Sequence, residues 1–145
     1  MYANVEIANL SSSFAEEESV DAVLTFRNLH NWLGPQMDSI FANSYKALKP
    51  GGIFGVVEHR ANKGTSIKNM KKSGYVSEEH AIMVAKRHGF TLIAKSEINA
   101  NKKDTKDHPK GVWTLPPNLR LKTIDKEKYI AIGESDRMTL LFKKL

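Results

Sequence analysis

Two apolar runs that flank an amphipathic segment constrain the fold of this chain more than any other feature. VDAVLTF (residues 20–26) and IFGVVEHR (53–60) have compact apolar cores with valines, which is typical of strands buried on both faces of a sheet. The segment between them, 35–49, carries apolar residues at helical spacing: Met37, Ile40, Phe41, Tyr45 and Leu48. This order predicts an α/β fold, in which helices cover the faces of a parallel sheet.

Further helices and strands are predicted along the rest of the chain. A helix is predicted over 77–88, because Ser77 can cap its start, its first turn is acidic and Gly89 follows its end. Segments with the pattern of strands are 4–10, 90–98 and 136–145. The segments predicted as loops are 63–75 and 99–135, the second with room for a short helix within 123–134.

The composition limits the classes of protein to which the chain can belong. Its 145 residues, 41% of them hydrophobic, are enough for one globular domain, which we place at 1–145. The absence of cysteine excludes structural disulfides and thiolate metal sites. The sequence has no apolar run long enough to cross a membrane and no signal peptide, so we expect no membrane partner and a cytoplasmic location.

The formal charge of +6 raises the question of nucleic-acid binding. The basic residues gather in two segments, 63–72 and 102–110, which contain no Phe, Tyr or Trp on which bases could stack. We therefore interpret these segments first as solvated loops and second as an anion-attracting face. A basic nucleic-acid-binding domain is kept only as the last alternative.

Polar side chains crowd the ends of the two apolar runs. FRNLHNW begins at the end of the first run, and EHR closes the second. Ligands of open parallel sheets bind beyond the carboxyl ends of the strands, so both groups are expected at one site. The candidate residues from these groups are Arg27, Asn28, His30, Asn31, Glu58, His59 and Arg60.

Five segments in order, FRNLHNW, LKPGG, EHR, WTLPP and ESDR, resemble the carboxyl-terminal half of class I S-adenosylmethionine-dependent methyltransferases. More closely, the chain is similar to a group of predicted methyltransferases that share FRNLHNW and WTLPP. The resemblance implies a partial Rossmann-like sheet, made of the family's fourth, fifth, seventh and sixth strands plus an amino-terminal strand, with the last strand antiparallel. The family's first two strands and its glycine-rich cofactor turn have no counterpart in this sequence, so we expect a truncated methyltransferase-like domain.

The resemblance also implies roles for individual residues. LHNW is similar to the HDW segment of small-molecule O-methyltransferases, whose histidine deprotonates the acceptor, so His30 is the expected catalytic base and His59 the second choice. Asn31 stands in the place of the aspartate. The implied cofactor-binding residues are Phe26, Arg27 and Asn28. The implied substrate-binding residues are Asn31, Trp32, Glu58, His59, Arg60 and Trp113.

Each of these roles has a structural alternative. His30 could cap the next helix, and Trp113 could be core packing. Arg27 could form a salt bridge with Glu58. No metal site is expected, because His30 and His59 come from different loops without tight ligand spacing.

The predicted function is an S-adenosylmethionine-dependent methyltransferase, or its acceptor-binding half, that acts on a small molecule. Because the glycine-rich turn is missing, we expect S-adenosylmethionine binding to be weak or lost in this chain. The first alternative is a binding module derived from a methyltransferase but without the cofactor. The run at 20–26 lacks its usual neighbouring strand, so we also expect a homodimer whose interface includes residues 1–26.

Overall fold

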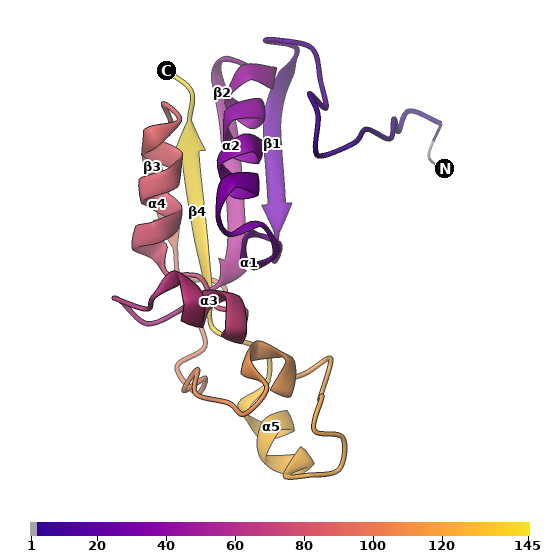
Figure 1. The fold of residues 1–145 in the computed structure, drawn as a ribbon, viewed down its shortest axis with the longest axis vertical. Helices are drawn as coiled ribbons and strands as arrows, with labels where there is room; N and C mark the ends of the chain where they lie inside the picture. The colour runs from indigo at the N-terminus through magenta and orange to yellow at the C-terminus, as the bar shows by residue number, and fades with distance from the viewer. Residues whose placement is uncertain (1–2) are drawn as a thin grey trace.

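Four strands form one mixed sheet in the computed structural model, which describes residues 3–145 (Figure 1). They are β1 (Val20–Phe26), β2 (Leu48–His59), β3 (Thr91–Ser96) and β4 (Arg137–Lys143). Their order across the sheet is β1-β2-β4-β3, with β1 parallel to β2 and β4 antiparallel to both of its neighbours. This arrangement confirms the predicted α/β fold with a partial Rossmann-like sheet and an antiparallel last strand.

Five α-helices and one 3-10 helix accompany the sheet within residues 3–145. They are α1 (Leu29–Trp32), α2 (Pro35–Ala47), α3 (Ile67–Ser73), α4 (Glu78–Arg87) and α5 (Lys126–Ile132), with one 3-10 helix, η1 (Gly111–Thr114). The Ser77 hydroxyl caps α4 by accepting a hydrogen bond from the backbone of His80. None of the helices within residues 3–145 is long and apolar enough to span a membrane.

Helix α3 corrects the prediction of a loop over 63–75. The Ser66 hydroxyl caps its start by accepting a hydrogen bond from the Asn69 N–H, and Gly74 ends it in the left-handed conformation. Met70 is the buried residue of this short helix and joins the main core. A single buried side chain gives no helical periodicity, so the sequence marks α3 only by the residues that begin and end it, Ser66 and Gly74.

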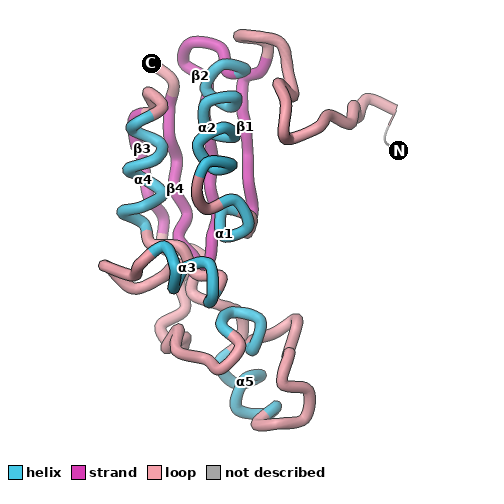
Figure 2. Tube along the Cα trace, in the orientation of Figure 1, coloured by secondary structure: helices cyan, strands magenta, loops and turns pink. Residues whose placement is uncertain are grey.

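Helices α2 and α4 cover one face of the sheet (Figure 2). Alternate residues of β2 and β4, among them Phe54 and Phe142, are buried at this face together with Phe41 of α2. The rings of Phe41 and Phe54 meet edge to face with their centroids 4.9 Å apart, a favourable aromatic geometry. The opposite face is less covered, and an apolar groove of about 350 Å³ crosses it beside Leu24 and Gly55.

The amino-terminal segment differs from its prediction. Residues 4–10 form no strand and run as turns and coil away from the sheet (Figure 1). A strand requires a partner for its backbone groups, and within residues 3–145 the strand β1 pairs only with β2. β1 is therefore an edge strand rather than one buried on both faces, and its residues Leu24 and Phe26 are each 58% exposed. The homodimer expected at this edge stays a prediction.

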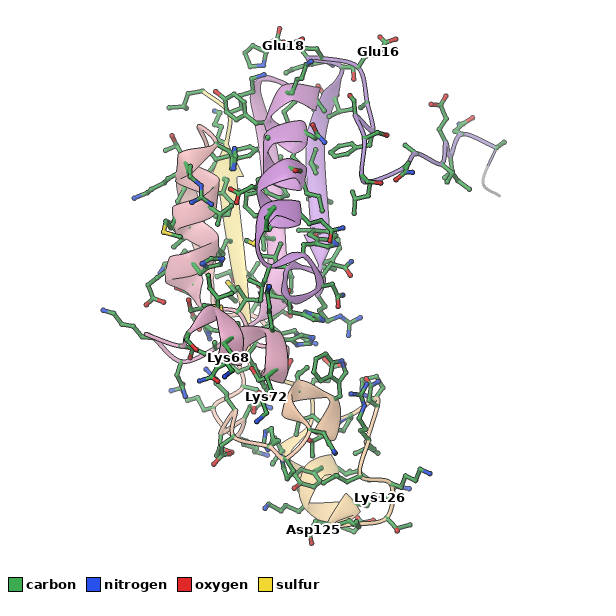
Figure 3. The ribbon with its side chains drawn as sticks, in the orientation of Figure 1. Glu16, Glu18, Lys68, Lys72, Asp125 and Lys126 are labelled. Carbon is green, nitrogen blue, oxygen red and sulfur yellow. The ribbon has the colours of Figure 1, made fainter. Side chains whose placement is uncertain are left out.

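The segments that follow β2 and β3 gather beyond the carboxyl end of β1, where α3, η1 and α5 lie (Figure 1). The buried carboxylate of Asp104 ties these segments together, because it accepts hydrogen bonds from the Tyr75 hydroxyl at 2.9 Å and the Asp136 N–H at 2.8 Å. Figure 3 shows Lys68 and Lys72 on α3, where both are exposed. The site is thus built at the end of the sheet where the parallel strands stop.

Candidate active site

A pocket of about 340 Å³ opens at the carboxyl ends of β1 and β2. Its walls come from the turn after β1, the end of β2, the loop that contains η1 and the residues that precede β4. The lining residues are Phe26, Arg27, His30, His59, Val112, Trp113, Pro116, Pro117, Asn118, Glu134, Ser135 and Arg137. Among the residues predicted from the sequence, the pocket brings together Phe26, Arg27, His30, His59 and Trp113.

His30 is held by the buried carboxylate of Glu58. This carboxylate lies at the end of β2 and is fully buried. It accepts hydrogen bonds from the backbone N–H groups of His30 at 2.9 Å and His59 at 2.7 Å. The Nδ1 atom of His30 lies 3.1 Å from both carboxylate oxygens. A carboxylate at this distance favours the tautomer with a proton on Nδ1, which leaves Nε2 as the basic nitrogen.

His59 lies next to His30 in the same pocket, with ring centroids 5.4 Å apart. Its Nδ1 atom is 2.5 Å from the Ser135 hydroxyl oxygen, which fixes the orientation of the ring. Burial lowers the pKa of His59 to about 3, and the neighbouring His30, Arg137 and Arg27 act in the same direction. His59 is therefore neutral near pH 7 and acts as a hydrogen-bonding group beside the predicted base.

The fold brings His30, Glu58 and His59 close enough to be compared with a metal site. One potential ligand atom from each residue lies within 4.8 Å of the others. The sequence expectation of no tight ligand spacing missed this proximity, because the carboxyl ends of two parallel strands supply the three residues. Hydrogen bonds already occupy both oxygens of Glu58, and Arg27 and Arg137 line the adjoining pocket. Both features favour a hydrogen-bonded cluster over a cation.

Trp113 forms an apolar wall of the pocket with Pro116 and Pro117. Its ring meets the imidazole of His30 edge on at a centroid distance of 5.9 Å. On the ring of Trp113, the guanidinium carbon of Arg120 lies 4.9 Å from the centroid, a cation–π contact that steadies the indole. Trp113 also packs against a small buried cluster of Ala61, Tyr75 and Val112, so the core-packing alternative holds alongside its position next to the predicted base.

Arg27 is the first residue after β1 and has an unusual backbone conformation. Its φ is +56°, in the left-handed region that few residues other than glycine adopt, and its N–H donates to the carbonyl of Val57 at 2.7 Å. The alternative salt bridge between Arg27 and Glu58 does not form, because the carboxylate pairs with His30. Within residues 3–145, Arg27 takes part in no salt bridge.

Arg60 is turned away from this pocket. Its guanidinium donates hydrogen bonds of 2.8–3.0 Å to the carboxylates of Asp136, Glu78 and Glu97. These partners occupy all of its charged nitrogens, so the structure gives Arg60 a structural role in place of the acceptor-binding role that the resemblance implied. The sequence shows only that an arginine follows the strand. It does not distinguish an arginine that binds a ligand from one that pairs with three carboxylates.

Three other predicted residues lie outside the pocket. Asn28 and Trp32 line a separate hollow of about 470 Å³ between β1, α2 and the amino-terminal segment, together with Leu10 and Phe14. Phe26 borders both the pocket and this hollow. Asn31 is exposed, and its amide donates to the side-chain oxygen of Asn28 at 3.3 Å.

Sequence reasoning missed the part of the pocket that precedes β4. Ser135 and Arg137 reach the site because β4 runs antiparallel to β2, which places the start of β4 beside the end of β2. Pro116, Pro117 and Asn118 complete the wall next to Trp113. The WTLPP and ESDR segments were recognised as parts of the resemblance, and they were the signal that could have identified these residues.

Comparison with known proteins was made for sequence and for structure. A sequence model described as a methyltransferase domain matches residues 3–56. A search of the curated proteins gave no match. The matched segment runs from the amino-terminal coil through β1 and α2 into β2, and it includes His30 but ends before Glu58.

Solved structures with the same fold are enzymes of more than one kind. The [4+2]-cyclase SpnF is 17% identical with a TM-score of 0.63, covering 96% of this chain and 56% of its own. A methyltransferase from Methanosarcina mazei, described as dependent on S-adenosylmethionine, is 13% identical with a TM-score of 0.60, covering 97% and 66%. A putative sarcosine dimethylglycine methyltransferase from Galdieria sulphuraria is 14% identical with a TM-score of 0.59, covering 94% and 57%.

The chain spans less than two thirds of the length of each of these three proteins. Its strand order, its helices and the domain match over residues 3–56 agree with one another. The chain therefore has the fold of the class I S-adenosylmethionine-dependent methyltransferases. With its four strands, it spans only part of that fold.

Proposed function

We propose that this chain forms the acceptor-binding part of an S-adenosylmethionine-dependent methyltransferase that methylates a hydroxyl group of a small molecule. The observation that carries the proposal is the contact between His30 and Glu58. A fully buried carboxylate 3.1 Å from Nδ1 orients the imidazole of His30, which lines the pocket. A histidine held in this way is suited to remove a proton from a hydroxyl group.

In this proposal, the hollow beside β1 binds the cofactor. Its wall is mainly apolar and aromatic, with Phe14, Phe26 and Trp32, which suits a flat purine ring. Thr25 also lines the hollow, and its hydroxyl is buried without a hydrogen-bond partner among the described residues, so a ligand atom would satisfy it. A related Haemonchus contortus phosphoethanolamine N-methyltransferase, 19% identical over 90% of this chain and 34% of its own, was solved with S-adenosylmethionine.

In the proposed methyl transfer, each residue of the pocket has its own role. When bound, S-adenosylmethionine would supply an electrophilic methyl group, whose carbon–sulfur bond would break as the acceptor oxygen bonds to the methyl carbon, with S-adenosylhomocysteine as the leaving group. His30 takes the hydroxyl proton on Nε2 as the oxygen–carbon bond forms, and Glu58 stabilises the resulting imidazolium. Trp113, Pro116 and Pro117 exclude water from one side and orient the acceptor.

The experiment measures transfer of labelled methyl groups from S-adenosylmethionine to a panel of small hydroxylated aromatics. His30→Ala should lower turnover by about 10²–10⁴-fold while S-adenosylhomocysteine binding is unchanged, and added imidazole should restore part of the rate. His80→Ala on α4, outside the pocket, is the matched control and should keep its turnover. Unchanged turnover in His30→Ala would contradict the role of His30 as the base, and no methyl transfer by the parent chain would contradict the proposal that its hollow binds the cofactor.

A further inference from the structure

The pocket that contains His30 holds an arginine without a carboxylate partner among residues 3–145. Arg27 and Arg137 line it, and both also line an adjoining recess of about 380 Å³. Arg137 is neutralised by Glu134, with its Nη2 atom 2.6 Å from a carboxylate oxygen. Arg27 is exposed and has no such partner among residues 3–145, so its guanidinium is free to pair with an anionic ligand.

The backbone of Arg27 suggests that its side chain is used. At a φ of +56°, glycine would be free of strain, whereas arginine must be held in place by the turn after β1. The hydrogen bond from its N–H to the carbonyl of Val57 supplies part of this restraint. Strained residues concentrate at ligand sites, and of the six described residues other than glycine that have a positive φ, Arg27 is the one that lines the pocket. Burial is the main cause of the lowered pKa of His59, and the guanidinium groups of Arg137 and Arg27, which line the same pocket, are also near enough to lower it.

We propose that the acceptor carries an anionic group, a carboxylate or a phosphate, and that Arg27 binds this group. This inference rests on the proposed function and names the substrate class: a small planar hydroxylated acid. Its ring lies against the wall made by Trp113 and Pro116, and its hydroxyl faces His30. A guanidinium suits either anion, because it donates two parallel hydrogen bonds to carboxylate or phosphate oxygens.

Arg27 faces the acceptor rather than the cofactor for a geometric reason. It lines the pocket shared by His30, His59 and Trp113, and it is not among the residues of the hollow that contains Phe14 and Thr25. A carboxylate on the cofactor would offer the same chemistry to a guanidinium. The experiment must therefore separate these two sources as well as carboxylate from phosphate.

The test is calorimetric binding of three probes to the full chain: 4-hydroxybenzoate, 4-hydroxyphenyl phosphate and the neutral 4-hydroxybenzamide. We expect at least one anionic probe to bind about tenfold or more tightly than the amide. Arg27→Gln should remove this preference, and Arg27→Gly should do the same while relieving the backbone strain. Arg87→Gln, which changes an arginine paired with Asp38 between α2 and α4, is the matched control and should keep the preference.

Binding is measured without methyl transfer, so the result is distinguishable from a failure of the proposed function. Equal binding of all three probes, or binding of none, overturns the inference. A preference that survives in both Arg27 variants also overturns it. If Arg27→Gln weakens S-adenosylhomocysteine but leaves the anionic probes unchanged, the arginine belongs to the cofactor and the inference is again wrong.

Discussion

Replacing Arg60 by methionine tests how the site end of the fold is held together. The guanidinium of Arg60 bridges three segments, because Glu78 begins α4, Glu97 follows β3 and Asp136 precedes β4. Its side chain is only 17% exposed, and that of Asp136 is 8% exposed. Methionine keeps most of the aliphatic length but leaves three carboxylates without their shared cation, and two of them are largely buried.

The expected loss of stability is worked out from the pKa of Asp136. Burial alone would raise its pKa, but hydrogen bonds from Arg60, Lys106 and the Asn101 N–H together lower the pKa from 3.8 to about 2. At about 1.4 kcal/mol per pKa unit, this corresponds to roughly 2 kcal/mol of stability at pH 7. Lys106 would remain in the variant, but Glu78 would lose its buried partner as well. We expect Arg60→Met to lower the free energy of unfolding by about 2–3 kcal/mol.

The assay is urea unfolding of both proteins between pH 7 and pH 3. A carboxyl whose pKa is lowered on folding stabilises the protein above its unfolded pKa, and the contribution is lost as the pH falls through the folded pKa. The difference between the proteins should therefore be constant from pH 7 to about 5 and shrink below about pH 4. Contributions from other titrating groups occur in both proteins and cancel.

Arg87→Met is the matched control for Arg60→Met. The pair of Arg87 with Asp38 lies between α4 and α2, with side chains 52% and 37% exposed. An exposed pair of this kind contributes less than about 1 kcal/mol, so the control should lose little stability. Equal losses in the two variants, or a loss for Arg60→Met that is as large at pH 3 as at pH 7, would refute the reasoning.

Two further predictions concern Gly111, at the start of η1, and the strand-end histidine His59. Gly111→Ala should lower stability by about 2 kcal/mol or more in thermal unfolding, because φ is +59° and a Cβ would overlap the backbone of Ser73. Gly64→Ala, at φ +80° with nothing within 4 Å of a Cβ, should lose only about 1 kcal/mol, so equal losses would count against the steric explanation. The pKa of His59 falls from 6.5 to about 3, so its stabilising contribution is complete above pH 6.5 and is lost as the pH falls toward 3. His59→Gln should flatten the decline in stability over this interval, and an unchanged pH profile would show that His59 is not responsible for it.

The sequence by itself determined the elements whose residues repeat with the period of a strand or a helix. The apolar runs became β1 and the carboxyl-terminal part of β2, and the spacing of Met37, Ile40 and Phe41 became the buried face of α2. The predicted capping at Ser77 and the helix within 123–134 were also confirmed, as α4 and α5. In each case the information is local, because side chains three or four residues apart on a helix, or two apart on a strand, share a face.

The sequence also predicted the position of the site. Polar residues directly after two parallel strands must meet at the carboxyl edge of the sheet, and His30, Glu58 and His59 do so. The sequence did not predict the distances between these side chains or their hydrogen-bond partners. Glu58 was predicted to bind substrate, yet it is buried on the same face of β2 as Phe54 and Val56, and only the tertiary structure brings His30 to its carboxylate.

Tertiary structure alone decided the features that depend on contacts between distant segments. Residues 4–10 alternate like a strand, but alternation does not supply a pairing partner, and the segment remains coil. Arg60 meets carboxylates 18, 37 and 76 residues away in the chain. Ser135 reaches His59 because β4 runs antiparallel to β2. Periodicity records which face of an element is apolar, whereas these contacts follow from how the elements are ordered and directed in the sheet, which no local pattern encodes.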